Sequence, residues 1–293
     1  MKVLRIFPRK TNATPTDENA IINRNPNLFD EADQIYISVA FTWDIPRAEK
    51  LAYMWESVAP VSMGGPAFNE MGGEFEPGKY LKNGYTITSR GCPNKCWFCS
   101  VWKREPEVKE LSIKPGWNII DDNLLACSDQ HIKNVFEMLK VQKHEVSFTG
   151  GIEAKLLKQW HVDLFTQIRL KELFCAYDTP DDYEPLVEAG KLLHQANITY
   201  ENRKARAYVL IGYPKDTFSD AMIRIKQTLD AGFMPFAMLW RNEKGECKRE
   251  WEQFQRQWAN PIITAVNCKK LKIEAELQAL KDKRNATEKT EKV

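Results

Sequence analysis

The stretch SDQHIKNVFEMLKVQKHEVSFTGG, residues 128–151, holds one helix and one strand of the repeat that decides the fold. Ser128 is a typical N-cap residue, and Ile132, Val135, Phe136 and Leu139 follow it at the i, i+3, i+4, i+7 spacing of one helix face. The run EVSFTGG then combines β-forming residues with a glycine stop. The stretch therefore predicts a helix that leads directly into a strand.

The same alternation continues on both sides of this stretch. Strand-like runs at residues 85–89, 173–179, 207–214 and 233–239 are separated by helical patterns, and the pattern at 217–232 starts at a capping threonine and stops at a glycine. Repeated strand–helix units predict parallel strands joined by right-handed crossovers. We therefore predict an α/β fold whose parallel sheet is either a barrel or an open, doubly wound sheet.

The chain divides into three segments by pattern. Residues 1–80 read as a small Rossmann-like α/β unit, with strand-like runs at 3–7 and 34–41 and a helical pattern at 45–58. A glycine- and proline-rich stretch at 64–82 suggests a linker, and residues 81–260 carry the strand–helix repeats. Residues 261–293 are highly charged and predict a C-terminal helix followed by a charged, disordered tail.

The composition indicates a globular protein, with 43% hydrophobic and 28% charged residues. The net charge of +2 gives no strong signal for nucleic-acid binding. No apolar run has the length of a membrane span, and the first residues lack the apolar region of a secretory signal. Seven cysteines, an odd and uneven set, argue against a secreted disulfide framework. We expect a cytoplasmic protein without a membrane partner.

Three of the seven cysteines lie within eight positions of RGCPNKCWFCSVW, at Cys92, Cys96 and Cys99. Structural zinc takes four protein ligands, and most iron–sulfur clusters are held by four cysteines. Three thiolates therefore either recruit a distant ligand or leave one metal position open to a substrate or cofactor. A zinc site completed by Cys127 or His131 is the alternative for this loop.

The predicted strands end in groups that could share one rim, because function collects at the carboxyl ends of parallel strands. The cysteine loop follows the first strand, and Thr149, Gly150 and Gly151 follow the second. The ends of the next three strands carry Asp178, then Gly212 and Tyr213, and finally Arg241.

The spacing Cys92-Pro-Asn-Lys-Cys96-Trp-Phe98-Cys99 resembles the CxxxCxφC motif of the radical S-adenosylmethionine (radical SAM) superfamily. The resemblance spans about residues 83–241 and implies a partial parallel (β/α) barrel. It also implies that the three cysteines hold a 4Fe-4S cluster and that S-adenosyl-L-methionine binds the fourth iron. Its reductive cleavage would yield a 5′-deoxyadenosyl radical that abstracts hydrogen from an unidentified substrate. An external one-electron reductant, such as a flavodoxin- or ferredoxin-like protein, is then required.

Further positions extend this resemblance. TGGIE at 149–153 is similar to the family's GGE motif, with Ile152 inserted, which implies cofactor-binding roles for Thr149, Gly150, Gly151 and Glu153. Phe98 occupies the aromatic position of the cysteine motif and is expected to pack on the adenine. Gly212 matches one glycine of the later GxIxGxxE motif. Asp178 and Arg241 are the predicted catalytic residues, placed to bind the substrate across the rim; an ion pair between them that braces the rim is the structural alternative.

The N-terminal segment resembles the cobalamin-binding-like flank of some radical SAM enzymes. The DxHxxG motif of cobalamin ligation is absent from it, so we expect no cobalamin with a histidine ligand. A non-catalytic iron–sulfur or zinc module, serving electron transfer or binding, is the alternative function for the whole chain.

Overall fold

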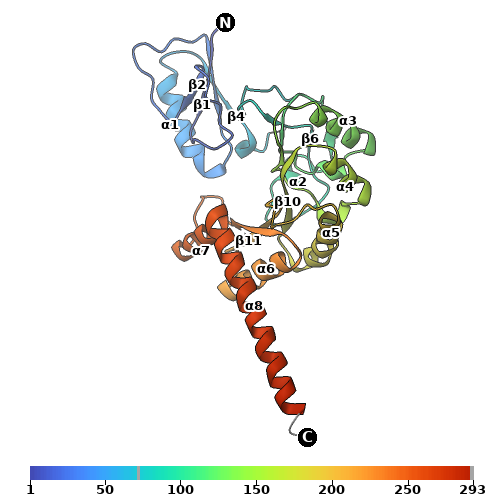
Figure 1. Cartoon of the computed structure of the whole chain (residues 1–293). Helices are drawn as coiled ribbons and strands as arrows, with labels where there is room; N and C mark the ends of the chain where they lie inside the picture. Colours follow the sequence, from blue (N-terminus) through green and yellow to red (C-terminus); the bar gives the residue numbers. More distant parts are fainter. Residues whose placement is uncertain (71–72, 291–293) are drawn as a thin grey trace. The chain divides into compact units, whose positions relative to one another are not determined.

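The computed structural model describes residues 1–70 and 73–290 and divides the chain into two compact units. The first unit comprises Met1–Phe174 with Arg241–Glu246, and the second comprises Cys175–Trp240 with Cys247–Val293 (Figure 1). Short 3-10 turns accompany the helices and strands of both units, at Thr42–Asp44, Pro66–Phe68, Leu124–Ala126, Ala154–Leu156 and Pro180–Asp182. The two units are described separately below.

A four-stranded parallel sheet opens the first unit. Its strands are β1 (Val3–Phe7), β2 (Ala20–Ile22), β3 (Gln34–Ser38) and β4 (Val61–Gly64), in the order β2-β1-β3-β4. Helix α1 (Ile45–Trp55) has Pro46 in its first turn, where a missing N–H costs nothing, and buries Leu51 and Trp55 in the same core as the strands. The strands predicted at 3–7 and 34–41 and the helix predicted at 45–58 are present as β1, β3 and α1, together with β2 and β4.

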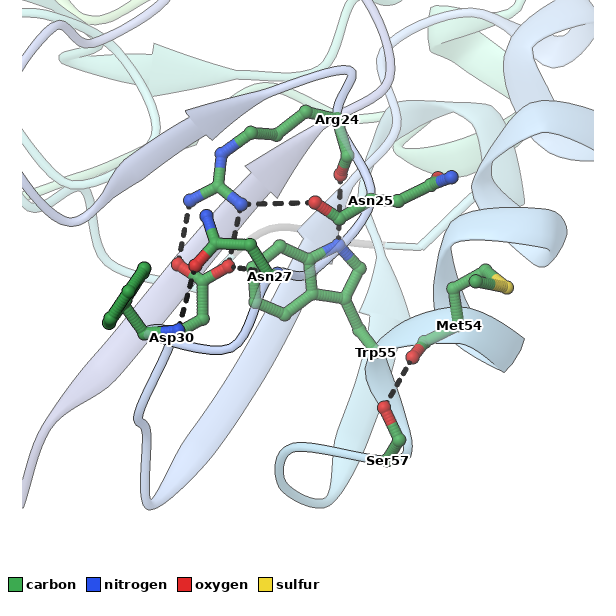
Figure 2. A network of polar contacts seen from close by, with 8 residues as sticks. Arg24, Asn25, Asn27, Asp30, Met54, Trp55 and Ser57 are labelled. Carbon is green, nitrogen blue, oxygen red and sulfur yellow. Dashed lines mark hydrogen bonds and ion pairs between the residues drawn. The ribbon is translucent and has the colours of Figure 1, made fainter.

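The loop between β2 and β3 is tied to α1 by a polar network (Figure 2). The guanidinium of Arg24 donates two hydrogen bonds to Asp30, at 2.6 and 2.7 Å, and lies 5.4 Å from the centre of the Trp55 ring. The indole N–H of Trp55 donates to the carbonyl of Arg24 at 3.0 Å, and the N–H of Asn27 donates to Asp30. These contacts attach the β2–β3 loop to the buried side chain of Trp55.

Replacing Asp30 with alanine is expected to lower the free energy of unfolding by about 1 kcal/mol, the upper range for a partly exposed bidentate pair. The Arg24 guanidinium lowers the pKa of Asp30, so this stabilisation is present above about pH 4 and is lost as the pH falls through the lowered pKa. Urea unfolding at pH 7 and pH 3 measures both effects. Glu31→Ala, at an exposed neighbouring carboxylate, is the control; an equal loss in the two variants would contradict the prediction.

The main sheet of the first unit contains β5 (Tyr85–Thr86), β8 (Asn118–Ile119), β9 (Val146–Phe148) and the start of β10 (Leu170–Tyr177), in that order and all parallel. Helices α3 (Asp129–Lys140) and α4 (Gln159–Thr166) connect the later strands. Phe136 of α3, Phe148 of β9 and Phe165 of α4 are buried together, with ring centres 5.0 to 5.7 Å apart. This aromatic contact fixes both helices on the sheet.

The helix and strand predicted within residues 128–151 are confirmed. The hydroxyl of Ser128 accepts a hydrogen bond from the N–H of His131 at 3.2 Å, as an N-cap does. The short strand β8 was not predicted. Strands β6 (Ser89–Arg90) and β7 (Lys109–Glu110) pair antiparallel. The cysteine loop and helix α2 (Val101–Arg104) lie between them in the chain.

The second unit contains the end of β10, followed by β11 (Ala205–Ile211) and β12 (Met234–Leu239), and β11 pairs with β12 in parallel. Its helices are α5 (Tyr183–Gln195), α6 (Phe218–Asp230), α7 (Arg249–Ala259) and α8 (Pro261–Thr290). Val209, Ile225, Trp251 and Cys268 share one hydrophobic core. The long α8, red in Figure 1, covers most of the segment predicted as a helix and tail, and residues 291–293 lie outside the described residues.

The predicted α/β class with parallel strands is confirmed. In the main sheet of the first unit and in the sheet of the second, the strands follow one another in chain order, β5-β8-β9-β10 and β10-β11-β12, without the reversal that marks a doubly wound sheet; the small N-terminal sheet, β2-β1-β3-β4, does reverse. This order is that of a singly wound β/α sheet. Among the described residues, no strand pairing closes the sheet into a barrel. In the same residues, no helix is both long and apolar enough to cross a membrane.

Candidate metal and cofactor site

The three clustered cysteines lie in the loop between β6 and α2 of the first unit. Backbone hydrogen bonds shape this loop: the N–H of Cys92 donates to the carbonyl of Glu105 at 3.2 Å, and the N–H of Cys99 to that of Cys96 at 3.1 Å. The indole of Trp102 in α2 also donates to the carbonyl of Cys96, at 2.9 Å. None of the three forms a disulfide among the described residues, and all three residues are partly exposed, so the loop brings three sulfur donors together in one short segment.

The other four cysteines are poor candidates for ligands. Burial raises the pKa of the Cys127 thiol to about 11, that of Cys175 to about 12 and that of Cys268 to about 11, so these three stay protonated at neutral pH. The Cys247 thiol is 3.5 Å from the carboxylate of Glu252, in the second unit. The 92–99 loop therefore stays the predicted source of sulfur donors for a metal or cluster.

The loop supplies the donors but does not hold them in a finished metal geometry. Within residues 1–70 and 73–290, no three His, Cys, Asp or Glu side chains are gathered closely enough to hold a metal ion. Burial also raises the pKa of the Cys99 thiol, while the N–H of Val101, 3.4 Å from its sulfur, acts in the opposite direction. The chemistry of the set, three soft donors in one loop, fits an iron–sulfur cluster.

A segment after β8, Asp121-Asp122-Asn123, anchors the start of the cysteine loop. The buried carboxylate of Asp121 accepts three hydrogen bonds. Thr88 donates from its N–H at 2.7 Å and from its hydroxyl at 2.5 Å, and Ser89 donates from its hydroxyl at 2.8 Å. The carboxylate of Asp122 accepts from the N–H of Gly91 at 2.9 Å. Because these contacts precede Cys92 directly, they fix where the loop leaves the sheet.

Asn123 connects the cysteine loop with Glu153. Its amide nitrogen lies 3.5 Å from the sulfur of Cys92 and donates to the carboxylate of Glu153 at 2.5 Å. Its carbonyl oxygen is buried and has no partner among the described residues. Glu153 and Cys92, which the sequence places on two different strand ends, are thus brought together by a third residue.

The Thr149-Gly150-Gly151 turn also lies in the first unit, where β9 ends. Thr149 donates from its hydroxyl to the side-chain oxygen of Asn118 at 2.7 Å, and a Cβ on Gly150 would collide with the backbone of Ile120 and Asp121. Gly150 is therefore required by packing. Gly151 has a φ of 106° and open space around its Cα, so its backbone is open to a bound molecule.

Phe98 is partly buried and contacts the ring of Trp97 edge-on, at 5.4 Å between centres. The indole of Trp97 is 54% exposed. The two rings give the cysteine loop an aromatic surface, but no contact links Phe98 to the glycine turn, and its role in binding adenine stays a prediction.

Three further residues are predicted for the site, Asp178, Gly212 and Arg241. Asp178 and Gly212 lie in the second unit, whereas Arg241 belongs to the first. A Cβ on Gly212 would meet Leu239 and Trp251, so this glycine has a packing role. The guanidinium of Arg241 donates to the carbonyl of Gly245 at 3.0 Å. Catalytic roles for Asp178 and Arg241, and a cofactor role for Gly212, stay predictions.

Burial, then repulsion by Asp182, raises the pKa of the Asp178 carboxyl to about 7. The folded state therefore binds a proton that the unfolded chain, with a pKa near 4, releases, and stability falls as the pH rises from about 4 to 7. We expect Asp178→Asn to be more stable than the unmodified protein at pH 8, by on the order of 4 kcal/mol for three pKa units at about 1.4 kcal/mol each, and about equal to it at pH 4. Asp181→Asn, at an exposed position, is the control, and a wild-type stability that rises over this range would contradict the prediction.

The zinc alternative gains no support from the groups that would complete it. The buried ring of His131 has its Nε2 3.3 Å from the Thr88 hydroxyl and its Nδ1 3.6 Å from the Glu110 carboxylate. Both ring nitrogens therefore already face protein groups, and one of these groups, the Thr88 hydroxyl, also donates to Asp121. Cys127, as described above, is a buried protonated thiol.

Sequence reasoning missed Asp121, Asp122 and Asn123. The signal was present in WNIIDDN, a short apolar run that ends in polar side chains, as strand ends at functional rims do. The run is too short to show alternation, which is why β8 and its polar end went unrecognised.

No protein-family model matches this chain, and the curated proteins compared with it give no match either.

Proposed function

We propose that this protein is a radical SAM enzyme with the partial (β/α) barrel of that superfamily. The observation that carries the proposal is the set of three partly exposed cysteines, Cys92, Cys96 and Cys99, in the loop after β6, a few residues beyond β5, the first strand of a singly wound parallel sheet. The proposal includes a reducing, cytoplasmic location and an external one-electron reductant.

In this proposal the three cysteines would hold a 4Fe-4S cluster. When bound, the cluster supplies the electron that cleaves S-adenosylmethionine to methionine and a 5′-deoxyadenosyl radical. The chain's own contribution is positioning. Gly151 leaves open backbone in the turn after β9, Gly150 lets that turn pack on the segment after β8, and the side chain of Asn123 contacts both Cys92 and the Glu153 carboxylate.

The test is anaerobic reconstitution with iron and sulfide, reduction with dithionite and addition of S-adenosylmethionine. Iron and sulfide analysis should give about four of each per chain. 5′-Deoxyadenosine and methionine should appear even without substrate, slowly, and the EPR signal of the reduced cluster should change when the cofactor is added. A cluster or zinc ion with four protein ligands, and an EPR signal indifferent to the cofactor, would favour the non-catalytic module instead.

Asn123→Ala is expected to slow this uncoupled cleavage about tenfold, because groups that orient metal ligands typically contribute ten- to a hundredfold. The rate of 5′-deoxyadenosine formation and the iron content measure the effect. Asn134→Ala, on the exposed side of α3, is the matched control. Equal rates in the two variants would show that the contacts of Asn123 do not serve the site.

A further inference from the structure

A large cavity in the first unit lies beside the cysteine loop. Its volume is about 810 Å³, and Phe7, Ser38 and Gly64, which end β1, β3 and β4, form part of its wall. Ligands of parallel sheets bind where the strands end at their carboxyl side. The small N-terminal sheet thus presents its binding edge to this cavity.

Aromatic side chains line one part of the cavity. Phe7, Tyr36, Phe41 and Tyr80 contribute to its wall, and Phe41 stacks on Trp43 at 4.9 Å between ring centres. The Phe41 side chain is 37% exposed, so it is not fully buried by the protein's own residues. The volume and the rings suit an organic molecule with a flat, apolar body.

Two arginines line the part of the cavity formed by residues around the cysteine loop. Arg90 lies two residues before Cys92, and Arg104 ends the helix that follows Cys99. Within the described part of the chain, neither guanidinium donates a hydrogen bond or forms an ion pair, and the Nε of Arg90 is buried without a partner. A buried donor without an acceptor is costly, so a ligand that accepts hydrogen bonds there is favoured.

The acidic groups of the cavity do not fill this role. Six acidic side chains line it, and five are already engaged: Asp44 with Arg9, Glu76 with Lys79, and Glu70, Glu74 and Asp122 with backbone N–H groups. Asp122 and Asp121 attract Arg90 through space without contacting it, and Glu105 is the sixth. Among the described residues of the cavity, no side chain or carbonyl accepts a hydrogen bond from either guanidinium group.

We propose that this cavity binds an organic ligand with an aromatic body and one acidic group, a carboxylate, phosphate or sulfonate, and that Arg90 and Arg104 pair with that acid. The planar guanidinium matches such groups with two hydrogen bonds. Val101, which donates its N–H to the sulfur of Cys99, also lines the cavity. The ligand therefore lies against the cysteine loop, in a site distinct from the glycine turn, and its binding requires no cluster.

The test uses the purified full-length chain without iron and two fluorescent probes. 8-Anilinonaphthalene-1-sulfonate carries the aromatic body and the acid, and N-phenyl-1-naphthylamine is the same body without the sulfonate. We expect saturable, one-to-one binding of the sulfonate and weaker binding of the neutral probe. Arg90→Gln and Arg104→Gln should each weaken sulfonate binding roughly tenfold, the value of one charged hydrogen bond, and leave the neutral probe unaffected.

Two further variants keep the test decisive if an arginine variant fails to fold. Ser62→Trp places a large ring in the cavity from an exposed position of β4 and should abolish binding of both probes, while Ser62→Ala should not. Arg169→Gln, outside the cavity, is the charge control. Equal binding of the two probes, or sulfonate binding unaffected by Ser62→Trp, would overturn the proposal. Because no iron is present, neither result bears on the cluster.

Discussion

Each of the variants C92A, C96A and C99A is expected to retain almost no iron and sulfide after anaerobic reconstitution and to form no detectable 5′-deoxyadenosine. The reason is the size of the donor set. Three thiolates are the fewest that hold a 4Fe-4S cluster with one iron left for a cofactor, and the buried thiols of Cys127, Cys175 and Cys268 are single and shielded from solvent. Iron and sulfide analysis, EPR and product analysis measure the loss.

The matched control is C247A, which removes another partly exposed thiol from a different part of the chain. It should bind iron and sulfide as the unmodified protein does. C127A and C268A test the buried thiols in the same way. If C127A or C268A lost the cluster while C92A kept it, the assignment of the three ligands would be wrong.

Asp121→Ala is expected to lower the free energy of unfolding by about 4 kcal/mol, a large effect for a single polar side chain. The carboxylate is 1% exposed and accepts three hydrogen bonds from Thr88 and Ser89. Its removal takes away the shared acceptor of these three donors, and a buried donor left without an acceptor costs roughly 1–3 kcal/mol. It also releases the strand end that leads into the cysteine loop.

Asp122→Ala is the control for this prediction, because the neighbouring carboxylate accepts one backbone N–H and is less buried. We expect a loss of about 1 kcal/mol for it. Urea unfolding at pH 7, followed by tryptophan fluorescence, compares the two variants. Similar losses would mean that the Thr88 and Ser89 donors find other acceptors and that Asp121 does not anchor the loop.

The local pattern of the chain was enough to predict most helices and strands. Ser128 caps α3, Thr217 caps α6, and the apolar residues at helical spacing in α3, Ile132, Val135 and Phe136, are buried. These features depend on neighbours within a few residues, so they can be read along the chain. Strand β8 was not predicted because two residues are too few to show an alternating apolar pattern. Its strand conformation is defined by its pairing with β5 and β9.

The sequence by itself also determined the donor set, because the spacing of Cys92, Cys96 and Cys99 keeps three thiols in one loop whatever surrounds it. Only the tertiary structure decided what that loop touches. Asp121 and Asn123 reach it from a strand about thirty residues later, and the cavity joins Arg90 and Arg104 to the ends of β1, β3 and β4. Such contacts join residues distant along the chain, and no local period connects them. Asp121 and Asn123 come to the loop because β8 pairs in parallel with β5, whereas the cavity combines residues of separate sheets, which only packing within the first unit brings together.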